Sequence, residues 1–200
     1  KRVVENFEFE VSLDTSDEWI QARSGIKRRH FAAEGEKTSD MAISAAQAAL
    51  SDAGFEPNDL DAVIVATSTS DLTFPSVATI VQSGLNMTGG FAYDIQAVCA
   101  GFVFALSTAN AQILSGQAER IMVIGAESFS RLMDWEDRST CVLFGDGAGA
   151  VLLQAERGKG SSDDRGILSV DLNSDGRHKD ILYVDGGVST GQTGYLRMQG

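Results

Sequence analysis

Cys99 is the residue of this sequence best placed to act as a nucleophile. It follows an apolar, strand-like run over Phe91–Ile95 and begins a second apolar run over 99–114 that predicts a helix without a polar face. The dipole of such a helix favours the thiolate, which is the reactive form of a cysteine. The position alone leaves two interpretations equally open: a reactive thiol, or a cysteine that packs as a small hydrophobic residue.

The second cysteine, Cys141, begins an apolar run over 141–144 that predicts a strand with no helix behind it. We therefore expect Cys141 to pack inside the protein. Neither cysteine belongs to a CxxC pair or to a cluster with His30 or His178, the only histidines. A metal centre is therefore not expected. Two isolated cysteines favour reduced thiols in a cytoplasmic protein.

Trp19, Arg23 and Arg138 could together bind a nucleotide, because tryptophan stacks on flat bases and arginine pairs with phosphates. Separately, each would be an ordinary surface or half-buried residue. A basic cluster at 27–30 could likewise receive a phosphate-bearing ligand, although a solvated loop is the commoner role of such a cluster. The glycine-rich run over 145–149 resembles a phosphate loop only superficially, since a strand-like run follows it instead of a helix. We expect a tight turn between two strands there.

The bulk composition excludes several classes of function. The 200 residues carry 28 acidic and 16 basic side chains, for a net charge of −12, which disfavours nucleic acid as a partner. No apolar run reaches the ~18 residues that a membrane-spanning helix needs, and no segment reads as a signal peptide. We expect a soluble globular protein.

Alternating strand-like and helical patterns must position these side chains. Helices are predicted near 14–23, over 38–53, over 76–84 and over 99–114. Buried strands are predicted over 61–67, 91–95 and 120–126. Helix 99–114 should be central and buried all round, because apolar residues occupy all its faces. This order predicts an α/β fold with a largely parallel sheet.

The pattern changes after residue 140. Strand-like runs follow at 141–144, 148–153 and 166–172, and the polar, glycine-rich stretch over 173–194 predicts a long loop. Loops of this length in compact domains are usually functional or mobile.

Several motifs, taken in this order, resemble those of β-ketoacyl-acyl-carrier-protein synthase III, a condensing enzyme of the thiolase superfamily. They are Asp14-Thr-Ser-Asp-Glu-Trp-Ile20, Arg23-Ser-Gly-Ile26, Cys99-Ala-Gly-Phe102, Asp134-Trp-Glu-Asp-Arg138 and Thr140-Cys-Val-Leu-Phe-Gly-Asp-Gly-Ala-Gly149. The resemblance is nearly continuous from Arg2 to Gly200. It implies a thiolase-like layered fold (α-β-α-β-α) with mostly parallel central sheets. Residues 1–160 would be the N-terminal half that holds the nucleophile, and 161–200 the start of the C-terminal half, including a long loop.

The resemblance also implies roles for individual residues. Cys99 would accept an acyl group from acyl-CoA. Trp19 and Arg138 would enclose the adenine of CoA, with Arg23 and Thr15 near the nucleotide end.

Three further positions follow from the same resemblance. Phe74 resembles the residue that crosses a dimer interface to wall the partner's acyl pocket, and Phe144 and Leu196 resemble pocket-lining positions. Two positions depart from the family's usual pattern: Ser24 stands where threonine is usual, and Val98 precedes the nucleophile where alanine is commoner.

The family also uses a histidine and an asparagine from its C-terminal half beside its cysteine. The 200 residues stop before those positions, and His30 and His178 lie in the wrong contexts to replace them. The family's first strand, before Lys1, is also absent. The resemblance therefore implies that the chain alone lacks two of the three catalytic residues.

The expected function is acyl transfer at the start of fatty-acid synthesis. Cys99 would mediate the decarboxylative condensation of acyl-CoA, expected to be acetyl-CoA, with malonyl-acyl-carrier-protein to give 3-ketoacyl-acyl-carrier-protein. CoA enters as a substrate, and no cofactor is expected. The expected partners are the acyl carrier protein and a second copy in a homodimer, in the cytoplasm, with no nucleic acid and no membrane. Two alternatives stay open: a related starter, quinolone or polyketide-type condensing enzyme, and a non-catalytic acyl-binding subunit.

Overall fold

The computed structural model describes residues 2–161 and 163–199 of the chain. Its helices and strands gather into two compact units. The sheet unit contains residues 38–126 and the described part of 148–173, and the flanking unit contains 2–37, 127–147 and 174–199. The units interleave along the chain, so they do not coincide with the expected division into 1–160 and 161–200. That division stays a prediction about the halves of the family fold.

A four-stranded sheet forms the centre of the sheet unit. Its strands lie in the order β4 (Phe91–Ile95), β3 (Ala62–Ala66), β5 (Arg120–Ser128) and β6 (Asp146–Gln154). β3 pairs in parallel with both neighbours, with Ala62 opposite Phe91 and Ile121. All the β3 residues are buried, as expected for a central parallel strand covered on both faces. The three strands predicted from the sequence are thus confirmed, and β3 and β5 are buried as predicted. The predicted burial of 91–95 is wrong: β4 lies at the edge of the sheet, and none of its residues is buried.

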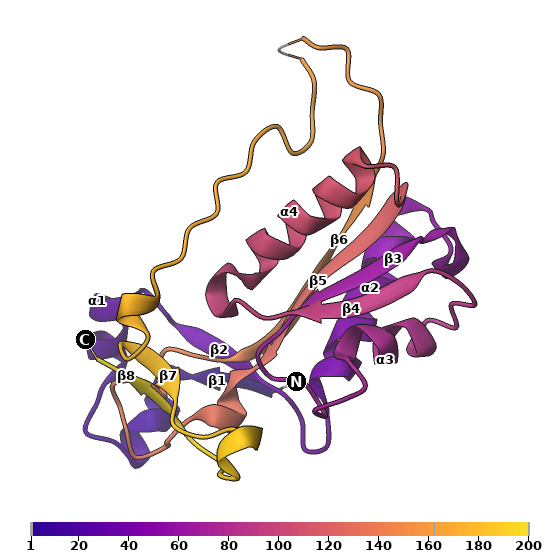
Figure 1. Ribbon diagram of the computed structural model, residues 1–200. Coiled ribbons are helices and arrows are strands. Elements are labelled where there is room, and N and C mark those ends of the chain that lie inside the picture. The colour runs from indigo at the N-terminus through magenta and orange to yellow at the C-terminus, as the bar shows by residue number, and fades with distance from the viewer. Residues whose placement is uncertain (1, 162, 200) are drawn as a thin grey trace. The chain divides into compact units, whose positions relative to one another are not determined.

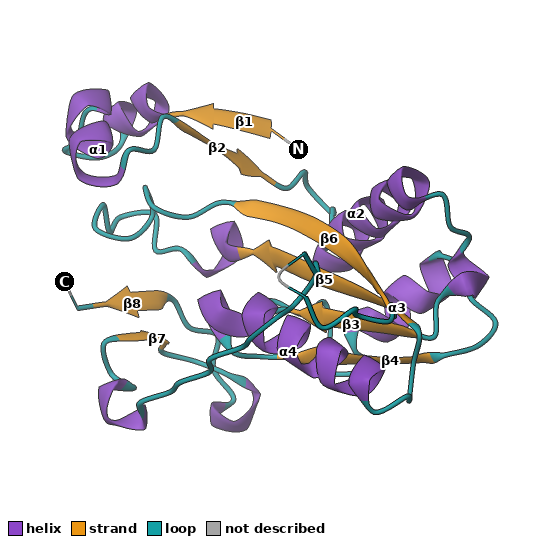
Figure 2. Ribbon diagram, turned by 90° about the horizontal axis from the view of Figure 1, so that it is seen from above, coloured by secondary structure: helices purple, strands orange, loops and turns teal. Residues whose placement is uncertain are grey.

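Helices cover the two faces of this sheet. α2 (Thr38–Ala53) and α3 (Val77–Gly84) pack on one face in a cluster that includes Val63. α4 (Gly101–Leu114) packs on the opposite face in a cluster that includes Ile64. Figures 1 and 2 show the resulting layers of helix, sheet and helix. All three helices lie where the sequence predicts them.

Local sequence signals set the ends of these helices. Gly54, with φ +71°, follows α2 in the left-handed conformation that glycine favours. The Ser76 hydroxyl accepts the N–H of Thr79 (3.2 Å) and so caps α3. A Cβ at Gly84 would lie 2.4 Å from Cδ1 of Ile43, so glycine is what lets α3 approach α2 closely.

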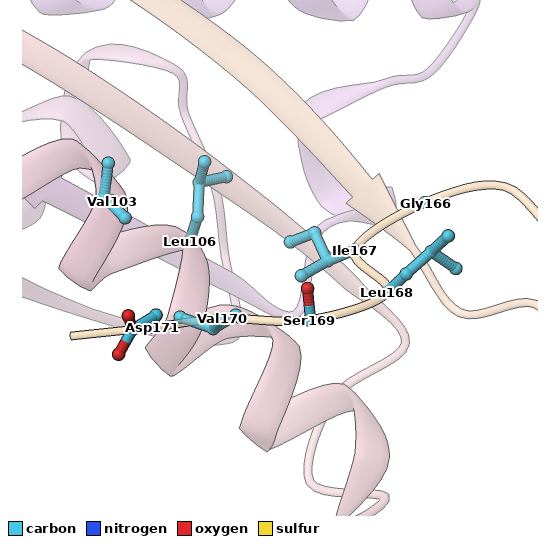
Figure 3. A pocket seen from close by; sticks show the side chains of 8 residues that line it. All are labelled: Val103, Leu106, Gly166, Ile167, Leu168, Ser169, Val170 and Asp171. Atoms are coloured by element: carbon cyan, nitrogen blue, oxygen red, sulfur yellow. The ribbon is translucent and has the colours of Figure 1, made fainter.

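The outer side of α4 differs from its prediction. Only Gly101, Ala105 and Ala109 of this helix are buried, whereas Val103 is 49% exposed. The prediction of burial all round is wrong for the described residues, because only the inner side of α4 packs on the sheet. Val103, together with Leu106, which also packs against the sheet, and residues 166–171, lines an open cavity of about 450 Å³, as Figure 3 shows.

The flanking unit is built from short elements. β1 (Arg2–Glu5) pairs antiparallel with β2 (Arg28–Phe31), and α1 (Asp17–Ser24) lies between them in the chain. β7 (Leu182–Val184) pairs antiparallel with β8 (Leu196–Met198). The core of the flanking unit is one cluster of eight buried residues: Val4, Phe9, Ile20, Phe129, Met133, Cys141, Val142 and Leu196. The helix predicted near 14–23 is confirmed as α1.

The strand predicted over 141–144 is wrong, and so is the tight turn predicted over 145–149. Residues 141–143 form turns, and β6 begins at Asp146 and runs through the glycines. The buried Asp146 carboxylate accepts the N–H groups of Ala32 (2.7 Å) and Ser130 (2.8 Å) and the Ser130 hydroxyl (2.6 Å). These bonds hold the chain extended where its glycine content favours a turn.

A different need explains the first glycine of that run. A Cβ at Gly145 would lie 3.1 Å from the Cβ of Arg29 and 3.1 Å from the carbonyl oxygen of His30. Close approach to β2, and not a turn, is what requires glycine there. The basic cluster at 27–30 is accordingly no solvated loop: it runs into β2, and Arg29 is buried.

The C-terminal stretch also differs from its prediction. Residues 166–172 form no strand, since no described strand pairs with them. The stretch predicted as a loop over 173–194 contains β7 and two turns of 3-10 helix. A strand needs a partner strand as well as an apolar pattern. Within 173–194, β7 pairs with β8, whereas 166–172 has no partner strand among the described residues.

Candidate active site

Cys99 lies in a short 3-10 turn, Val98–Ala100, between the end of β4 and the start of α4. Its side chain is exposed. Ala100, the residue before α4, supplies no side-chain cap, so the N-terminus of α4 faces this turn without a capping side chain. The prediction that Cys99 stands at a strand-to-helix junction is confirmed. A thiol in this place can attack an electrophile that approaches from solvent.

The backbone at this turn is strained. Val98 has φ +48°, in the left-handed region that β-branched residues rarely adopt. Such a conformation costs of order 1–3 kcal/mol and persists where the surrounding structure fixes it, often at a functional site. The strain lies directly before the candidate nucleophile, in the same short turn.

Regular elements hold both ends of the turn. Phe102, at the start of α4, packs over Gly125 of β5, where a Cβ would lie 3.3 Å from its ring. Asp94, near the end of β4, accepts the N–H groups of Val77 and Ala78, both at 2.8 Å. Burial raises the pKa of Asp94, and the two N–H groups oppose that rise. The strand that leads to Cys99 is thus bonded to the N-terminus of α3.

Trp19, Arg23 and Arg138 meet in one cavity of the flanking unit. The guanidinium carbons of Arg23 and Arg138 lie 4.8 Å and 5.0 Å from the Trp19 ring centroid, within the range of cation–π contact. The cavity, of about 460 Å³, is lined by Trp19, Ile20, Arg23, Ser24, Arg138, Ser139, Val142 and Leu143. A flat ring flanked by two cations can bind an aromatic group that carries phosphates.

The sequence signals at α1 explain how Trp19 is placed. The Ser16 hydroxyl accepts the Trp19 N–H (3.1 Å), and Asp17 and Glu18 follow in the first turn, as a helix N-terminus favours. Gly25 ends the helix with φ +72°. Trp19 and Arg23 lie four residues apart, so they share one face of α1.

Arg138 belongs to a loop held by polar side chains. Its Nη1 donates to the carbonyl oxygen of Asp14 and forms an ion pair with the Asp14 carboxylate (3.2 Å). Asp137 accepts the N–H and hydroxyl of Ser139 (2.9 and 2.5 Å) and the hydroxyl of Thr140 (3.1 Å). The hydroxyl of Ser139 is the main cause that lowers the pKa of Asp137.

Arg197 joins this loop to the β7–β8 hairpin. Its Nε donates to Asp185 (2.8 Å) and its Nη1 to Asp134 (2.9 Å). The two carboxylates, Asp185 first, raise the pKa of Arg197. The beginning of the Arg138 loop is therefore fixed by an ion-pair network.

The remaining predicted residues are placed as follows. Thr15 is half-buried, and its hydroxyl oxygen has no hydrogen-bond partner among residues 2–161 and 163–199. Phe74 is 82% exposed, directly before the cis peptide bond to Pro75. Phe144 stacks on Phe129 at 5.3 Å between ring centroids.

Leu196 is only 2% exposed and belongs to the core cluster of the flanking unit. The structure thus gathers Trp19, Arg23 and Arg138 at one cavity of that unit. It places Cys99 and Phe74 in the sheet unit.

Sequence reasoning missed the cavity residues that follow Arg138. Ser139, Val142 and Leu143 are unremarkable in type, and only the turn at Asp137 brings them to the cavity wall. Their nearness to Arg138 in sequence was the one available signal.

Cys141 behaves as predicted, although not in a strand. It is fully buried, and burial raises the pKa of its thiol to about 11. It packs in the core cluster of the flanking unit. Among the described residues, no group of three or more His, Cys, Asp or Glu side chains could hold a metal ion. The part of the chain that the structure describes also contains no helix long and apolar enough to cross a membrane.

Comparison with solved structures defines the class of protein. The crystal structure of 3-oxoacyl-[acyl-carrier-protein] synthase III from Aquifex aeolicus VF5 matches with a TM-score of 0.90 and 46% identity, over 100% of this chain and 61% of that one. The Thermus thermophilus β-ketoacyl-[acyl-carrier-protein] synthase III matches with a TM-score of 0.89 and 41% identity, over 100% and 62%. The predicted fold class is confirmed: the chain has the thiolase-like α/β fold of condensing enzymes.

Sequence comparison then specifies the family. A profile of the family described as 3-Oxoacyl-[acyl-carrier-protein (ACP)] synthase III matches residues 93–176. The β-ketoacyl-[acyl-carrier-protein] synthase III of Roseobacter denitrificans is 76% identical over 199 residues, which cover 100% of this chain and 62% of the relative. Over its whole length the chain is therefore similar to β-ketoacyl-[acyl-carrier-protein] synthase III enzymes. It spans about three fifths of the length of the curated relatives it matches.

Proposed function

We propose that the protein is an acyltransferase that initiates fatty-acid synthesis by condensing acyl-CoA, with acetyl-CoA as the expected donor, with malonyl-acyl-carrier-protein. One observation carries the proposal: Cys99 is an exposed thiol, presented by a strained turn at the N-terminus of α4, in a chain 76% identical to a synthase III. This identity favours synthase III over a related starter, quinolone or polyketide-type enzyme.

The first half-reaction transfers the acyl group to the protein. The Cys99 thiolate attacks the thioester carbonyl carbon of acyl-CoA, and the C–S bond to CoA breaks. CoA leaves as a thiolate and takes up a proton, and an acyl thioester on Cys99 remains.

The second half-reaction forms the new carbon–carbon bond. Malonyl-acyl-carrier-protein loses CO₂, and the resulting carbanion attacks the acyl carbonyl carbon on Cys99. The Cys99 thiolate then leaves, and 3-ketoacyl-acyl-carrier-protein is released. The histidine and asparagine that the family resemblance implies would stabilise the enolate oxygen of the carbanion.

The cavity at Trp19 is the proposed site for the nucleotide end of CoA. Trp19 and Arg138 would enclose the adenine, and Arg23 and Thr15 would lie near the nucleotide end. Because Arg138 already lies against the Trp19 ring, its side chain would have to swing away to admit a base. The unpartnered Thr15 hydroxyl is consistent with a ligand contact there.

The remaining roles are proposed on the resemblance. Phe144 and Leu196 would line the acyl pocket, and Phe74 would reach a second copy of the chain in a homodimer. The high exposure of Phe74 suits an interface residue. The proposed location is the cytoplasm, the proposed partner is an acyl carrier protein, and the thioester chemistry requires no cofactor.

Intact-mass analysis of the protein after incubation with acetyl-CoA tests the proposal. We expect one added acetyl group, which malonyl-acyl-carrier-protein then removes as a 3-ketoacyl product. Absence of the adduct would favour a non-catalytic acyl-binding subunit. If a malonyl thioester of another carrier removes the acetyl group faster than malonyl-acyl-carrier-protein does, the related starter enzymes are favoured.

A further inference from the structure

Two buried polar residues of the flanking unit take no part in the cavity but are bonded to both of its walls. Asn6 is 1% exposed and Arg29 is 6% exposed. Neither lines the cavity at Trp19. Buried polar groups cost free energy unless they are hydrogen-bonded, so the partners of this pair show what the fold uses it for.

Asn6 is bonded to the wall formed by α1. Its Nδ2 donates to the Asp17 carboxylate (2.8 Å) and to the carbonyl oxygen of Ile26 (2.6 Å). Asp17 is the first residue of α1, and Ile26 follows the glycine that ends it. One amide group therefore holds both ends of the helix that carries Trp19.

Arg29 is bonded to the opposite wall. Its Nη2 donates to the Asn6 side-chain oxygen (2.8 Å) and to the carbonyl oxygen of Val142 (2.8 Å). Val142 lines the cavity in the same loop as Arg138. The guanidinium also lies over the Phe9 ring, 4.7 Å from its centroid, which fixes its plane. A continuous chain of bonds thus runs from α1 through Asn6 and Arg29 to the Arg138 loop.

We infer that Asn6 and Arg29 are positioning residues that fix the spacing between the two walls of the Trp19–Arg138 cavity and thereby set the affinity for CoA. The inference rests on the proposed function, since it takes CoA as the ligand of this cavity. A flat group between two side chains needs both at a defined separation, and a preformed spacing lowers the ordering cost of binding. Loss of Asn6 removes one bond of the buried Arg29 and frees both ends of α1 from the Arg138 loop.

Asn6→Leu is the direct test, because it keeps the side-chain size and removes the bonds to Asp17, Ile26 and Arg29. Arg29→Lys is the second variant: it keeps the charge, but it loses the second nitrogen, which bonds the Val4 carbonyl oxygen (3.5 Å), and the planar group that lies over the Phe9 ring. Asn58→Leu is the matched control, since Asn58 accepts two bonds from Thr88 in the sheet unit. Arg28→Met controls for charge, as Arg28 is the exposed neighbour of Arg29 on β2.

The measurements are the Kd of CoA by calorimetry, the melting temperature, and the KM and kcat for acetyl-CoA in the intact protein. We expect Asn6→Leu and Arg29→Lys each to raise Kd and KM about tenfold, equivalent to ~1.4 kcal/mol. We expect kcat and the rate of Cys99 alkylation by a small reagent to stay unchanged. Both control variants should bind CoA as the wild type does, whatever their melting temperatures.

Three results would overturn the inference. The first is that Asn6→Leu or Arg29→Lys folds and binds CoA with unchanged affinity, while Arg138→Ala weakens CoA binding. The inference then fails, but the proposed function stands. The second is a fall of kcat and alkylation together with affinity, which indicates a general loss of structure. The third is that the wild-type protein binds no CoA, or that the Arg138→Ala variant binds CoA as tightly as the wild type does. In either case the proposed use of the cavity fails as well.

Discussion

The turn that carries Cys99 and the loop that carries Cys141 hold the same side chain in opposite environments. Cys99 is exposed between a strand and the start of a helix. Cys141 is fully buried in the core of the flanking unit, and burial raises its pKa to about 11. Side-chain type therefore says little about reactivity here, and what surrounds the thiol decides between catalysis and packing.

The two regions are also held in different ways. Regular elements fix the Cys99 turn, with β4 before it and α4 after it, and its strain is concentrated at Val98. Polar side chains fix the loop at 134–144: Asp137 bonds within the loop, and Arg197 ties Asp134 to the hairpin. A reactive group needs a rigid backbone below it, whereas a binding loop can be set by side-chain bonds.

The largest expected effect separates the two cysteines. Cys99→Ser should abolish the acetyl adduct formed with acetyl-CoA, and Cys141→Ser should leave it at one per chain. Peptide mapping of the adduct by mass spectrometry measures both. An adduct that persists in Cys99→Ser would show that the buried thiol, or another group, is the acceptor.

The second prediction concerns the pH dependence that Cys141 gives to stability. The folded thiol has a pKa of about 11, whereas an unfolded one has a pKa of ~8.5. The unfolded chain therefore loses its proton first as pH rises. The contribution is fully present below about pH 8.5 and is lost progressively as pH rises through about 11, a total loss of about 3 kcal/mol.

Urea unfolding at about pH 8 and about pH 10.5 measures this contribution in the wild type and in Cys141→Ala. The wild type should lose about 2 kcal/mol more than the variant between these pH values. Equal losses in the two proteins would mean that Cys141 is not buried as a thiol.

The third prediction tests whether the loop of the flanking unit binds substrate. Arg138→Ala should raise the KM for acyl-CoA about tenfold, because a stacked cation contributes on the order of 1 kcal/mol or more. Alkylation of Cys99 by a small reagent should not change. Arg131→Ala is the matched control, since Arg131 also bonds a backbone carbonyl of this unit, that of Glu36. If the alkylation of Cys99 slows together with a fall in kcat/KM for acyl-CoA, Arg138 supports the fold and not substrate binding.

The smallest expected effect concerns the strain at Val98. Val98→Gly removes the penalty of a left-handed β-branched residue but adds disorder to the unfolded chain, so the unfolding free energy should change by less than about 1 kcal/mol. Val103→Gly, in the interior of α4, should cost about 1 kcal/mol, because it lowers the helix propensity and removes a half-buried side chain. Urea unfolding compares the two. A larger loss for Val98→Gly than for Val103→Gly would mean that the turn is not strained.

Much of the sheet unit could be predicted from sequence because its signals are local. The apolar run Ala62–Ala66, the small residues of α2 and the glycines that follow α2 and α4 fix their own secondary structure. Cys99 could be placed at a helix start for the same reason. The burial of α4 was overestimated, because an apolar surface shows what a helix can bury and not what covers it.

Chain pattern and composition by themselves determined the α/β class, the strand-to-helix junction at Cys99 and the expectation that Cys141 is buried. Only the tertiary structure decided the rest of the flanking unit. There, Asp146 holds a glycine-rich segment extended by bonds to Ala32 and Ser130, and Arg29 is buried against Asn6 and the carbonyl of Val142. The physical reason is sequence separation: these bonds join residues up to 114 positions apart, and no local pattern records which distant acceptor a buried donor will find.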